Sequence, residues 1–242
     1  MNVTLSGIVL RYADYRDNDR MLTLFTREAG KLAVLSRGCR RSGSPLLSSS
    51  QPFAYSELVL FHNKGRYYLD SADLRESFYS ISSDVDRFAS GSYMVSLIAA
   101  LMAEGESNES IFTLLYHSLS FLSYSDSSPL DLALFFTVRS LSIAGYSPSL
   151  THCAICGRDL RTMRKAGFSA ANGGAVCDAC KGSGLTYISA LSLEAIRRMI
   201  QLPEADIQKV VLPQTVREEL KPALKGYVEY ILDKRIKAFD ML

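Results

Sequence analysis

Four cysteines constrain most strongly what this chain can fold into. Cys153 and Cys156 form one Cys-X2-Cys pair, and Cys177 and Cys180 form a second pair after twenty intervening residues. Each pair can offer two thiolates to one ion, and a spacer of this length allows a short hairpin that brings the pairs together. The pattern therefore predicts one tetrahedral metal site, which we assign to a single structural Zn²⁺ ion.

Other uses of the cysteines fit less well. A thioredoxin-like redox pair would lie at a strand-to-helix junction in an α/β protein, and none of the ferredoxin spacings of iron–sulfur proteins occurs. A catalytic zinc keeps one coordination position open, whereas four thiolates fill the tetrahedron. The zinc deaminase signature needs His-X-Glu, but His152 is followed by Cys153 and Ala154. We expect His152 to be a neighbour of the site and not a ligand.

The length and composition indicate a folded, cytoplasmic protein. The 242 residues are 48% hydrophobic and 21% charged, which suits a buried core and is too apolar for intrinsic disorder. The longest apolar stretch, residues 93–103, is shorter than the roughly 20 residues that span a bilayer. The first basic residue is Arg11, so the N-terminus lacks the charged head of a signal peptide. In a reducing compartment the fifth cysteine, Cys39, is interpreted as adventitious.

The net charge of +2 conceals an uneven distribution. Residues 1–80 carry +3, residues 81–150 carry −5, residues 151–190 carry +3 and residues 191–242 carry +1. The total excludes a uniformly basic nucleic-acid binder, but it leaves a basic N-terminal segment. Such blocks can also be solvated faces without a partner, so charge alone leaves both interpretations open.

The first 80 residues predict a small β barrel. Segments rich in branched and aromatic side chains predict strands at residues 3–12, 21–26, 31–37, 53–62 and 66–76. The Asn63-Lys64-Gly65 sequence between the last two strands is a strong hairpin signal. Five short strands with one long connection favour a small barrel over a sandwich, which usually needs seven or more. Residues 38–52 are too polar for a core element and predict a mobile loop.

Residues 81–242 predict a helical domain that contains the cysteine segment, at about 150–185, as an insertion. Apolar residues recur every three or four positions. This spacing predicts helices at residues 85–101, 111–122, 130–141 and 192–202, and a last helix that begins between 213 and 222. Ser128 and Ser192 are expected to cap two of them, and Pro222 fits only a first turn or a kink. The fold class is therefore α+β and multidomain.

No catalytic constellation accompanies these elements. The chain lacks the glycine-rich loops that cradle phosphates and the nucleophile elbow of hydrolases. It contains only three histidines, and His117 lies in an apolar helical pattern where a core role is more common than catalysis. The sequence therefore argues against an enzyme.

Cations and aromatic side chains alternate along the predicted barrel strands. The cations that we predict to bind nucleic acid are Arg11, Arg20, Lys31, Arg37, Arg40, Arg41 and Arg66. The interleaved aromatic residues are Tyr12, Tyr15, Phe25, Tyr55, Phe61, Tyr67 and Tyr68. OB folds hold single strands with cations on phosphates and rings under bases. Because half of each strand in a small barrel points inward, we assign most of these rings to the core and expect the arginines to carry the binding.

Four N-terminal segments resemble the bacterial RecO family of DNA repair proteins. They are residues 7–11 (GIVLR), 15–31 (YRDNDRMLTLFTREAGK), 37–41 (RGCRR) and 51–53 (QPF). The resemblance extends over essentially the whole chain, including the helical block with its inserted four-cysteine motif. It implies an N-terminal OB fold, a helical C-terminal domain and a zinc-binding subdomain.

The same resemblance implies a role in recombination in the cytoplasm, in association with the nucleoid. RecO-like proteins bind single- and double-stranded DNA and anneal complementary strands. With RecR, and often RecF, they load RecA onto strands coated with single-stranded DNA-binding protein, whose acidic C-terminal tail they also recognise. One departure concerns residues 42–50, which are rich in serine where family members often carry further Lys or Arg. This loop is therefore expected to hold DNA less firmly.

Cations near the C-terminus are the predicted contact for an acidic partner tail. They are Lys225, Lys234, Arg235 and Lys237, all assigned to the last helix. Cations at the end of a helix also interact favourably with its dipole, which is the alternative explanation. Two other functional classes stay open: a zinc-ribbon adaptor that acts mainly through protein partners, and a zinc enzyme with an open coordination position.

Overall fold

The N-terminal residues form a closed five-stranded barrel in the computed structural model, which describes residues 2–180, 182 and 185–242. The strands are β1 (Asn2–Tyr15), β2 (Asp19–Thr26), β3 (Gly30–Ser36), β4 (Tyr55–Asn63) and β5 (Arg66–Glu76). Their order around the barrel is β1-β2-β3-β5-β4, and β1 pairs with β4 to close it. Only β3 and β5 run parallel. This is the Greek-key order of an OB fold, so the predicted strands and fold class are confirmed.

The connection from β3 to β4 packs against the barrel. It consists of turns and the short 3-10 helix η1 (Ser48–Ser50). The Gly38 backbone nitrogen donates to Asp19 Oδ1 at 2.8 Å, and Cys39 and Phe53 are buried. Residues 38–52 were predicted to be too polar for a core element, but Cys39 within them is buried, and Phe53, predicted to begin a strand, precedes β4. The polar composition of the segment conceals a few apolar side chains that face inward.

Five α-helices follow the barrel in the described residues. They are α1 (Val85–Leu101), α2 (Glu109–Tyr124), α3 (Pro129–Ile143), α4 (Ala190–Gln201) and α5 (Gln214–Leu232). Helix α3 is apolar on nearly all sides and packs against the other four, as expected of a helix at the centre of a bundle. No helix in the described part of the chain is long and apolar enough to cross a bilayer.

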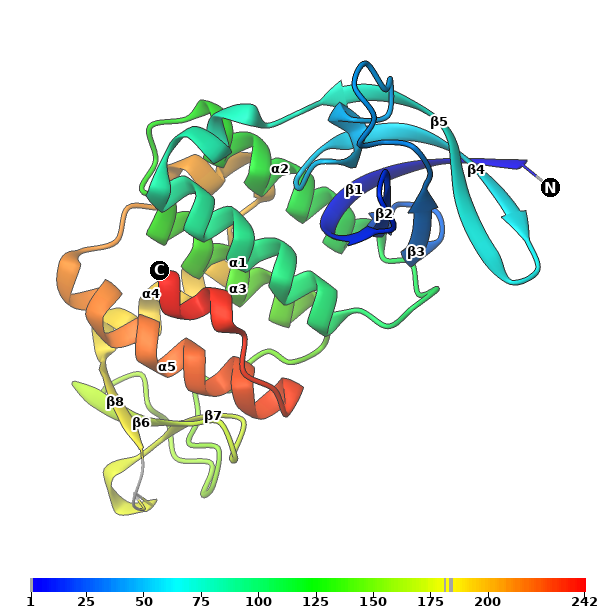
Figure 1. Cartoon of the computed structure of the whole chain (residues 1–242). Coiled ribbons are helices and arrows are strands. Elements are labelled where there is room, and N and C mark those ends of the chain that lie inside the picture. The colour runs from blue at the N-terminus through cyan, green and yellow to red at the C-terminus, as the bar shows by residue number, and fades with distance from the viewer. Residues whose placement is uncertain (1, 181, 183–184) are drawn as a thin grey trace.

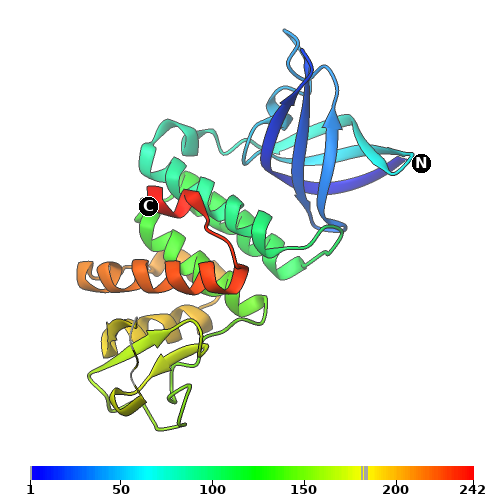
Figure 2. The same ribbon diagram turned by 60° about the horizontal axis from the view of Figure 1, so that its bottom comes forward.

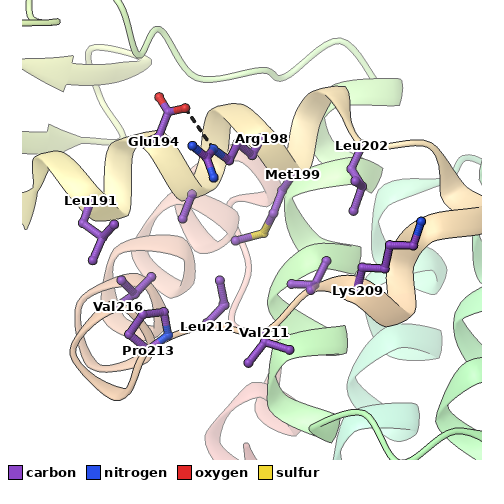
Figure 3. A pocket seen from close by; sticks show the side chains of 12 residues that line it. Leu191, Glu194, Arg198, Met199, Leu202, Lys209, Val211, Leu212, Pro213 and Val216 are labelled. Atoms are coloured by element: carbon purple, nitrogen blue, oxygen red, sulfur yellow. Dashed lines mark hydrogen bonds and ion pairs between the residues drawn. The ribbon is translucent and has the colours of Figure 1, made fainter.

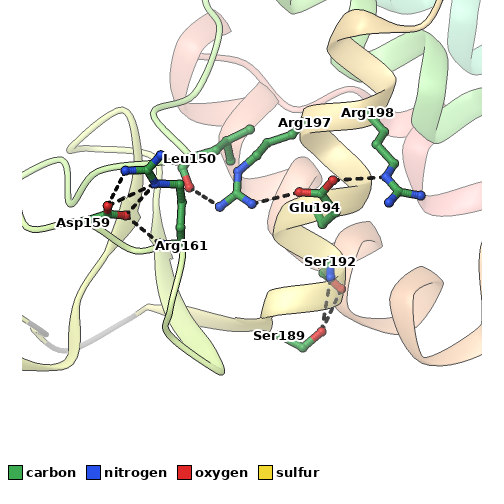
Figure 4. Close-up of polar contacts among 8 residues, drawn as sticks. All are labelled: Leu150, Asp159, Arg161, Ser189, Ser192, Glu194, Arg197 and Arg198. Carbon is green, nitrogen blue, oxygen red and sulfur yellow. Dashed lines mark hydrogen bonds and ion pairs between the residues drawn. The ribbon is translucent and has the colours of Figure 1, made fainter.

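The starts of three helices test the predictions made from capping and proline residues. The Ser128 hydroxyl accepts a hydrogen bond from the Asp131 backbone nitrogen, as predicted for a cap of α3. The predicted cap at Ser192 was wrong, because α4 begins earlier and Ser189 caps it (Figure 4). Helix α5 begins at Gln214, which places Pro222 inside the helix and not in its first turn.

The barrel and the helices share one apolar core. Ile8, Phe25 and Phe53 of the barrel side belong to the same buried cluster as the helical residues. The Phe25 and Phe112 rings lie 6.1 Å apart, centroid to centroid. A second cluster, which includes Leu22 and Leu24, fills the barrel interior. The two halves are therefore joined by packing and not only by the chain.

A small antiparallel sheet lies between α3 and α4 in the sequence. Its strands are β6 (Lys165–Ser169), β7 (Gly174–Val176) and β8 (Thr186–Ser189), in the order β7-β6-β8. Figures 1 and 2 show the barrel at one end of the helical body and this sheet at the other. The β6–β7 hairpin brings the two cysteine pairs together as predicted, whereas β8 was not predicted.

Candidate metal centre and nucleic-acid interface

The four predicted cysteines converge on one point. The Sγ atoms of Cys153, Cys156, Cys177 and Cys180 all lie within 4.8 Å of one another, and the Cys156 and Cys177 sulfurs are 3.7 Å apart. A Zn–S bond of about 2.3 Å in a tetrahedron requires sulfurs about 3.8 Å apart, whereas a disulfide requires about 2 Å. The sulfur spacing therefore fits four ligands around one ion.

Backbone turns hold the first two sulfurs in place. The Gly157 nitrogen donates to the Cys153 carbonyl at 2.9 Å, and Gly157 has a φ of +73°, which favours glycine. The Cys177 nitrogen points at Cys153 Sγ from 3.4 Å. His152, which we expected to be a neighbour, lies with its Nδ1 3.1 Å from Thr151 Oγ1. Among the described residues, the metal-ligand cluster consists of the cysteines alone.

The thiols differ in their readiness to lose a proton. Burial raises the pKa of Cys153, but hydrogen bonds from the backbone of Cys177, Cys156 and Ile155 outweigh it and lower the pKa to about 6. Hydrogen bonds with the Cys156 and Cys177 thiols raise the pKa of Cys180 to about 12. Because thiolates are the ligands, metal binding must release protons. The affinity for metal should therefore decrease as the pH is lowered.

The cysteine sheet is attached to the helical body at defined points. A Cβ atom on Gly174 would lie 2.3 Å from the Ser149 carbonyl oxygen, so only glycine allows this close approach. Arg197 of α4 donates to the Leu150 carbonyl at 2.7 Å and pairs with Glu194 at 3.0 Å (Figure 4). The segment that leads into the metal centre is thus tied to α4 by the Arg197 side chain.

Five of the seven barrel cations predicted to bind nucleic acid are exposed. They are Arg11, Arg37, Arg40, Arg41 and Arg66. The sequence places Arg37, Arg40 and Arg41 directly after β3, at the start of the packed connection. The Arg40 guanidinium lies 3.5 Å from an Asp14 carboxylate oxygen, so part of its charge is offset within the protein.

The other two cations are engaged inside the structure. Arg20 has a side chain that is 11% exposed and pairs with Asp14, and its guanidinium carbon lies 3.7 Å from the centroid of the Tyr12 ring. Lys31 Nζ donates to the carbonyls of Ala99 and Met102 at 2.8 and 2.6 Å. The assignment of both residues to DNA binding stays a prediction, but their visible contacts are structural.

Several barrel aromatics lie outside the core, contrary to our expectation. Of the seven rings, Phe25 alone is fully buried, whereas Tyr12, Tyr15 and Phe61 are 38%, 38% and 41% exposed. Alternation along a strand predicts which residues share a face. It does not reveal which face of a strand is turned to solvent, and Phe61 lies on the outer face of the barrel, next to the buried Leu60.

The four C-terminal cations are not all on a helix. Lys225 belongs to α5, but the helix ends at Leu232, and the other three follow it. Asp240 pairs with Lys225 at 2.5 Å and with Arg235 at 2.6 Å, and these hydrogen bonds lower the pKa of its carboxyl group. The remaining two, Lys234 and Lys237, are exposed beside a cavity of about 210 Å³ that Arg11 also lines.

A second surface feature is an apolar groove of about 310 Å³ along α4. Figure 3 shows Leu191 and Met199 on one side, Val211 on the other, and the cations Arg198 and Lys209 near it. Helix α4 and the extended residues 210–213 form its walls. No sequence signal marked this groove, because it depends on how two distant segments pack.

Comparisons with known proteins cover both halves of the chain. Residues 1–78 match the family model described as "Recombination protein O N terminal", and residues 82–239 match "Recombination protein O C terminal". A protein named "DNA repair protein RecO" from Caldicellulosiruptor saccharolyticus is 32% identical, over 98% of this chain and 96% of its own length. Proteins of the same name from Alkaliphilus metalliredigens (30% identical, 97% and 95%) and Desulforamulus reducens (28% identical, 98% and 93%) are also similar.

Proposed function

Because the chain belongs to the RecO family of DNA repair proteins, we propose that it is a recombination mediator that binds single- and double-stranded DNA and anneals complementary strands. With RecR, and in some pathways RecF, it helps load RecA onto strands coated with single-stranded DNA-binding protein. It acts in the cytoplasm, in association with the nucleoid. Annealing needs no chemical catalyst, because neutralised phosphates allow strands to approach, so the proposed role is not enzymatic.

The observation that carries this proposal is the group of exposed arginines after β3. Arg37, Arg40 and Arg41 are exposed and follow β3 of a barrel of OB topology. Each cation that neutralises a phosphate of a single strand contributes about −0.7 to the slope of log affinity against log salt. Replacing all three with serine should therefore flatten the slope by about 2.

A matched control removes the same charge elsewhere. Arg158, Arg198 and Lys209 are exposed cations outside the barrel, in the cysteine segment, in α4 and in the segment after it. Their triple serine variant should keep the slope. An unchanged slope in the barrel variant would place the DNA site elsewhere. If the parent protein binds no DNA at low or high salt, the zinc-ribbon adaptor becomes the better explanation. Annealing of oligonucleotides coated with the single-strand-binding protein then measures the proposed activity directly.

We also propose that the four cysteines hold one structural Zn²⁺ ion. The donor set supports this, because four thiolates at tetrahedral spacing saturate zinc and leave no position for a substrate water. Elemental analysis of the purified protein should find one zinc per chain, and Cys177→Ser should lose it. A protein with no zinc, or a metal-edge spectrum with ligands other than four sulfurs, would contradict the assignment.

The contact for the acidic partner tail is proposed at Lys234 and Lys237. The pairing of Lys225 and Arg235 with Asp240 leaves these two as the stronger candidates of the original four. Reversing both charges to glutamate should abolish binding of a fluorescent acidic peptide. Loss of binding in an Arg198→Glu, Lys209→Glu variant instead would move the contact to the groove of Figure 3.

A further inference from the structure

Two aromatic side chains lie together on the outer surface of the barrel. Phe61 of β4 and Tyr68 of β5 are directly paired across the strands, with ring centroids 6.4 Å apart and planes tilted by 39°. The preceding and following residues, Leu60 and Leu69, are a buried pair that points into the barrel. The Phe61 and Tyr68 side chains therefore face outward, because successive side chains on a strand alternate.

Polar groups surround this ring pair in a cavity of about 240 Å³. The cavity is lined by Arg37, Asn63 and Asp70 together with the two rings. The Arg37 guanidinium carbon lies 4.4 Å from the Tyr68 ring centroid. Asn63 shares a face with the first ring and Asp70 with the second, because each is two residues further along its strand. An aromatic surface, a cation, an amide and a carboxylate thus meet in one place.

This combination complements one unpaired nucleotide. Rings of bases stack on aromatic side chains whatever the sequence, and an amide or carboxylate can hydrogen-bond the edge of a base that has left the stack. The Asp70 carboxylate repels phosphate, so the cavity itself favours a base over the backbone. Arg37 lines the cavity, and it precedes Arg40 and Arg41 in the sequence, the residues that we proposed to contact phosphates.

We propose that this cavity is a subsite for a single unpaired DNA base, which stacks on Phe61 and Tyr68 while Arg37 contacts the adjacent phosphate. The proposal rests on the DNA-binding function above and adds a means of telling single strands from duplexes, since paired bases cannot enter. Asp70 only accepts hydrogen bonds when ionised, so bases with an exocyclic amino group bind better than thymine.

The experiment compares aromatic variants on defined oligonucleotides. Phe61→Leu combined with Tyr68→Leu removes the aromatic faces and keeps apolar side chains. This variant should bind a cytosine or adenine single strand about tenfold more weakly. Its salt slope and its duplex affinity should not change, because no phosphate contact is lost. The matched control is Tyr79→Leu combined with Tyr187→Leu, which removes two exposed aromatic side chains elsewhere and should leave binding unchanged.

Two further readouts separate stacking from a structural effect. A 2-aminopurine placed in the single strand should be quenched on binding the parent and not the Phe61, Tyr68 variant. Removing the bases from the strand should weaken its binding to the parent but not to that variant. Asp70→Asn should reduce the preference for cytosine or adenine over thymine. If the Phe61→Leu, Tyr68→Leu variant binds single-stranded DNA with the affinity and salt dependence of the parent, the base subsite is wrong and the proposed function stands. A parent protein that binds no DNA would overturn both.

Discussion

Lys31 was predicted to bind nucleic acid, but its contacts indicate that it fastens the barrel to α1. Its ammonium group donates to the carbonyls of Ala99 and Met102 at the C-terminal end of that helix, where unpaired carbonyls and the negative end of the helix dipole both favour a cation. We predict that Lys31→Met lowers the free energy of unfolding and leaves the salt dependence of DNA binding unchanged.

The expected size follows from the two hydrogen bonds. A hydrogen bond to a charged group contributes about 1.5–3 kcal/mol. Burial lowers the pKa of Lys31, with Glu104 opposing that shift, so desolvation offsets part of the gain. Methionine keeps the aliphatic stem but leaves both carbonyls without this donor. We therefore expect a loss of about 2 kcal/mol, which moves the urea midpoint down by about 1 M at a slope of about 2 kcal/mol per molar.

The urea midpoint is measured by monitoring unfolding through fluorescence. DNA titrations at several salt concentrations give the salt dependence of affinity. Arg66→Met is the matched control, because Arg66 is exposed at the hairpin tip. It should show the opposite behaviour: unchanged stability and weaker DNA binding. The reasoning is refuted if Lys31→Met unfolds at the same urea concentration as the parent, or if it flattens the salt slope as strongly as loss of an exposed arginine does.

Three further predictions concern the helical body and the metal-binding sheet. Gly174→Ala should force the backbone away from Ser149 and release metal to a chelator faster than the parent, and equal retention would contradict this. Arg217→Met should lower the free energy of unfolding by about 3 kcal/mol, because it leaves the buried Asp131 carboxylate, 1% exposed, without its cation. Adding Asp131→Asn should restore part of this stability, and a double variant whose losses simply add would contradict the reasoning. Burial raises the pKa of Glu219, but hydrogen bonds from the first turn of α4 outweigh this and lower it. The stabilisation is therefore complete above the unfolded value of about 4.3 and lost as pH falls through the folded pKa, so Glu219→Gln should flatten the stability curve on the acid side.

Local patterns predicted the elements that depend on neighbouring residues. Segments rich in branched and aromatic side chains located the barrel strands, and periodicity of three to four located the helices. The Cys-X2-Cys spacing predicted a metal-ligand cluster that the sulfurs form. Each of these signals acts within a few residues, or through ligand chemistry that admits few alternatives. Strand number and length predicted a small barrel, and the resemblance to the RecO family implied its OB topology.

Features that depend on distant segments were not predictable in this way. Lys31 looks like any cation on a basic strand until α1 places its last carbonyls beside it. Phe61 and Tyr68 look like core residues until the strand register places Leu60 and Leu69 inside the barrel and both rings outside it. Ser192 resembles a cap because the first turn of α4 has no apolar periodicity of its own, and its hydroxyl instead donates to Glu219 of α5.

The core shared by barrel and helices has a consequence for synthesis on the ribosome. Phe53 leaves the exit tunnel well before Phe112, since about sixty residues separate them. At about 5–20 residues per second, the barrel waits roughly 3–12 s for the helix that covers its apolar side. During that interval a nascent chain exposes the surface that later becomes its interior. Slow translation across residues 60–110 should therefore increase aggregation and the need for chaperones, even though this surface is buried in the finished protein.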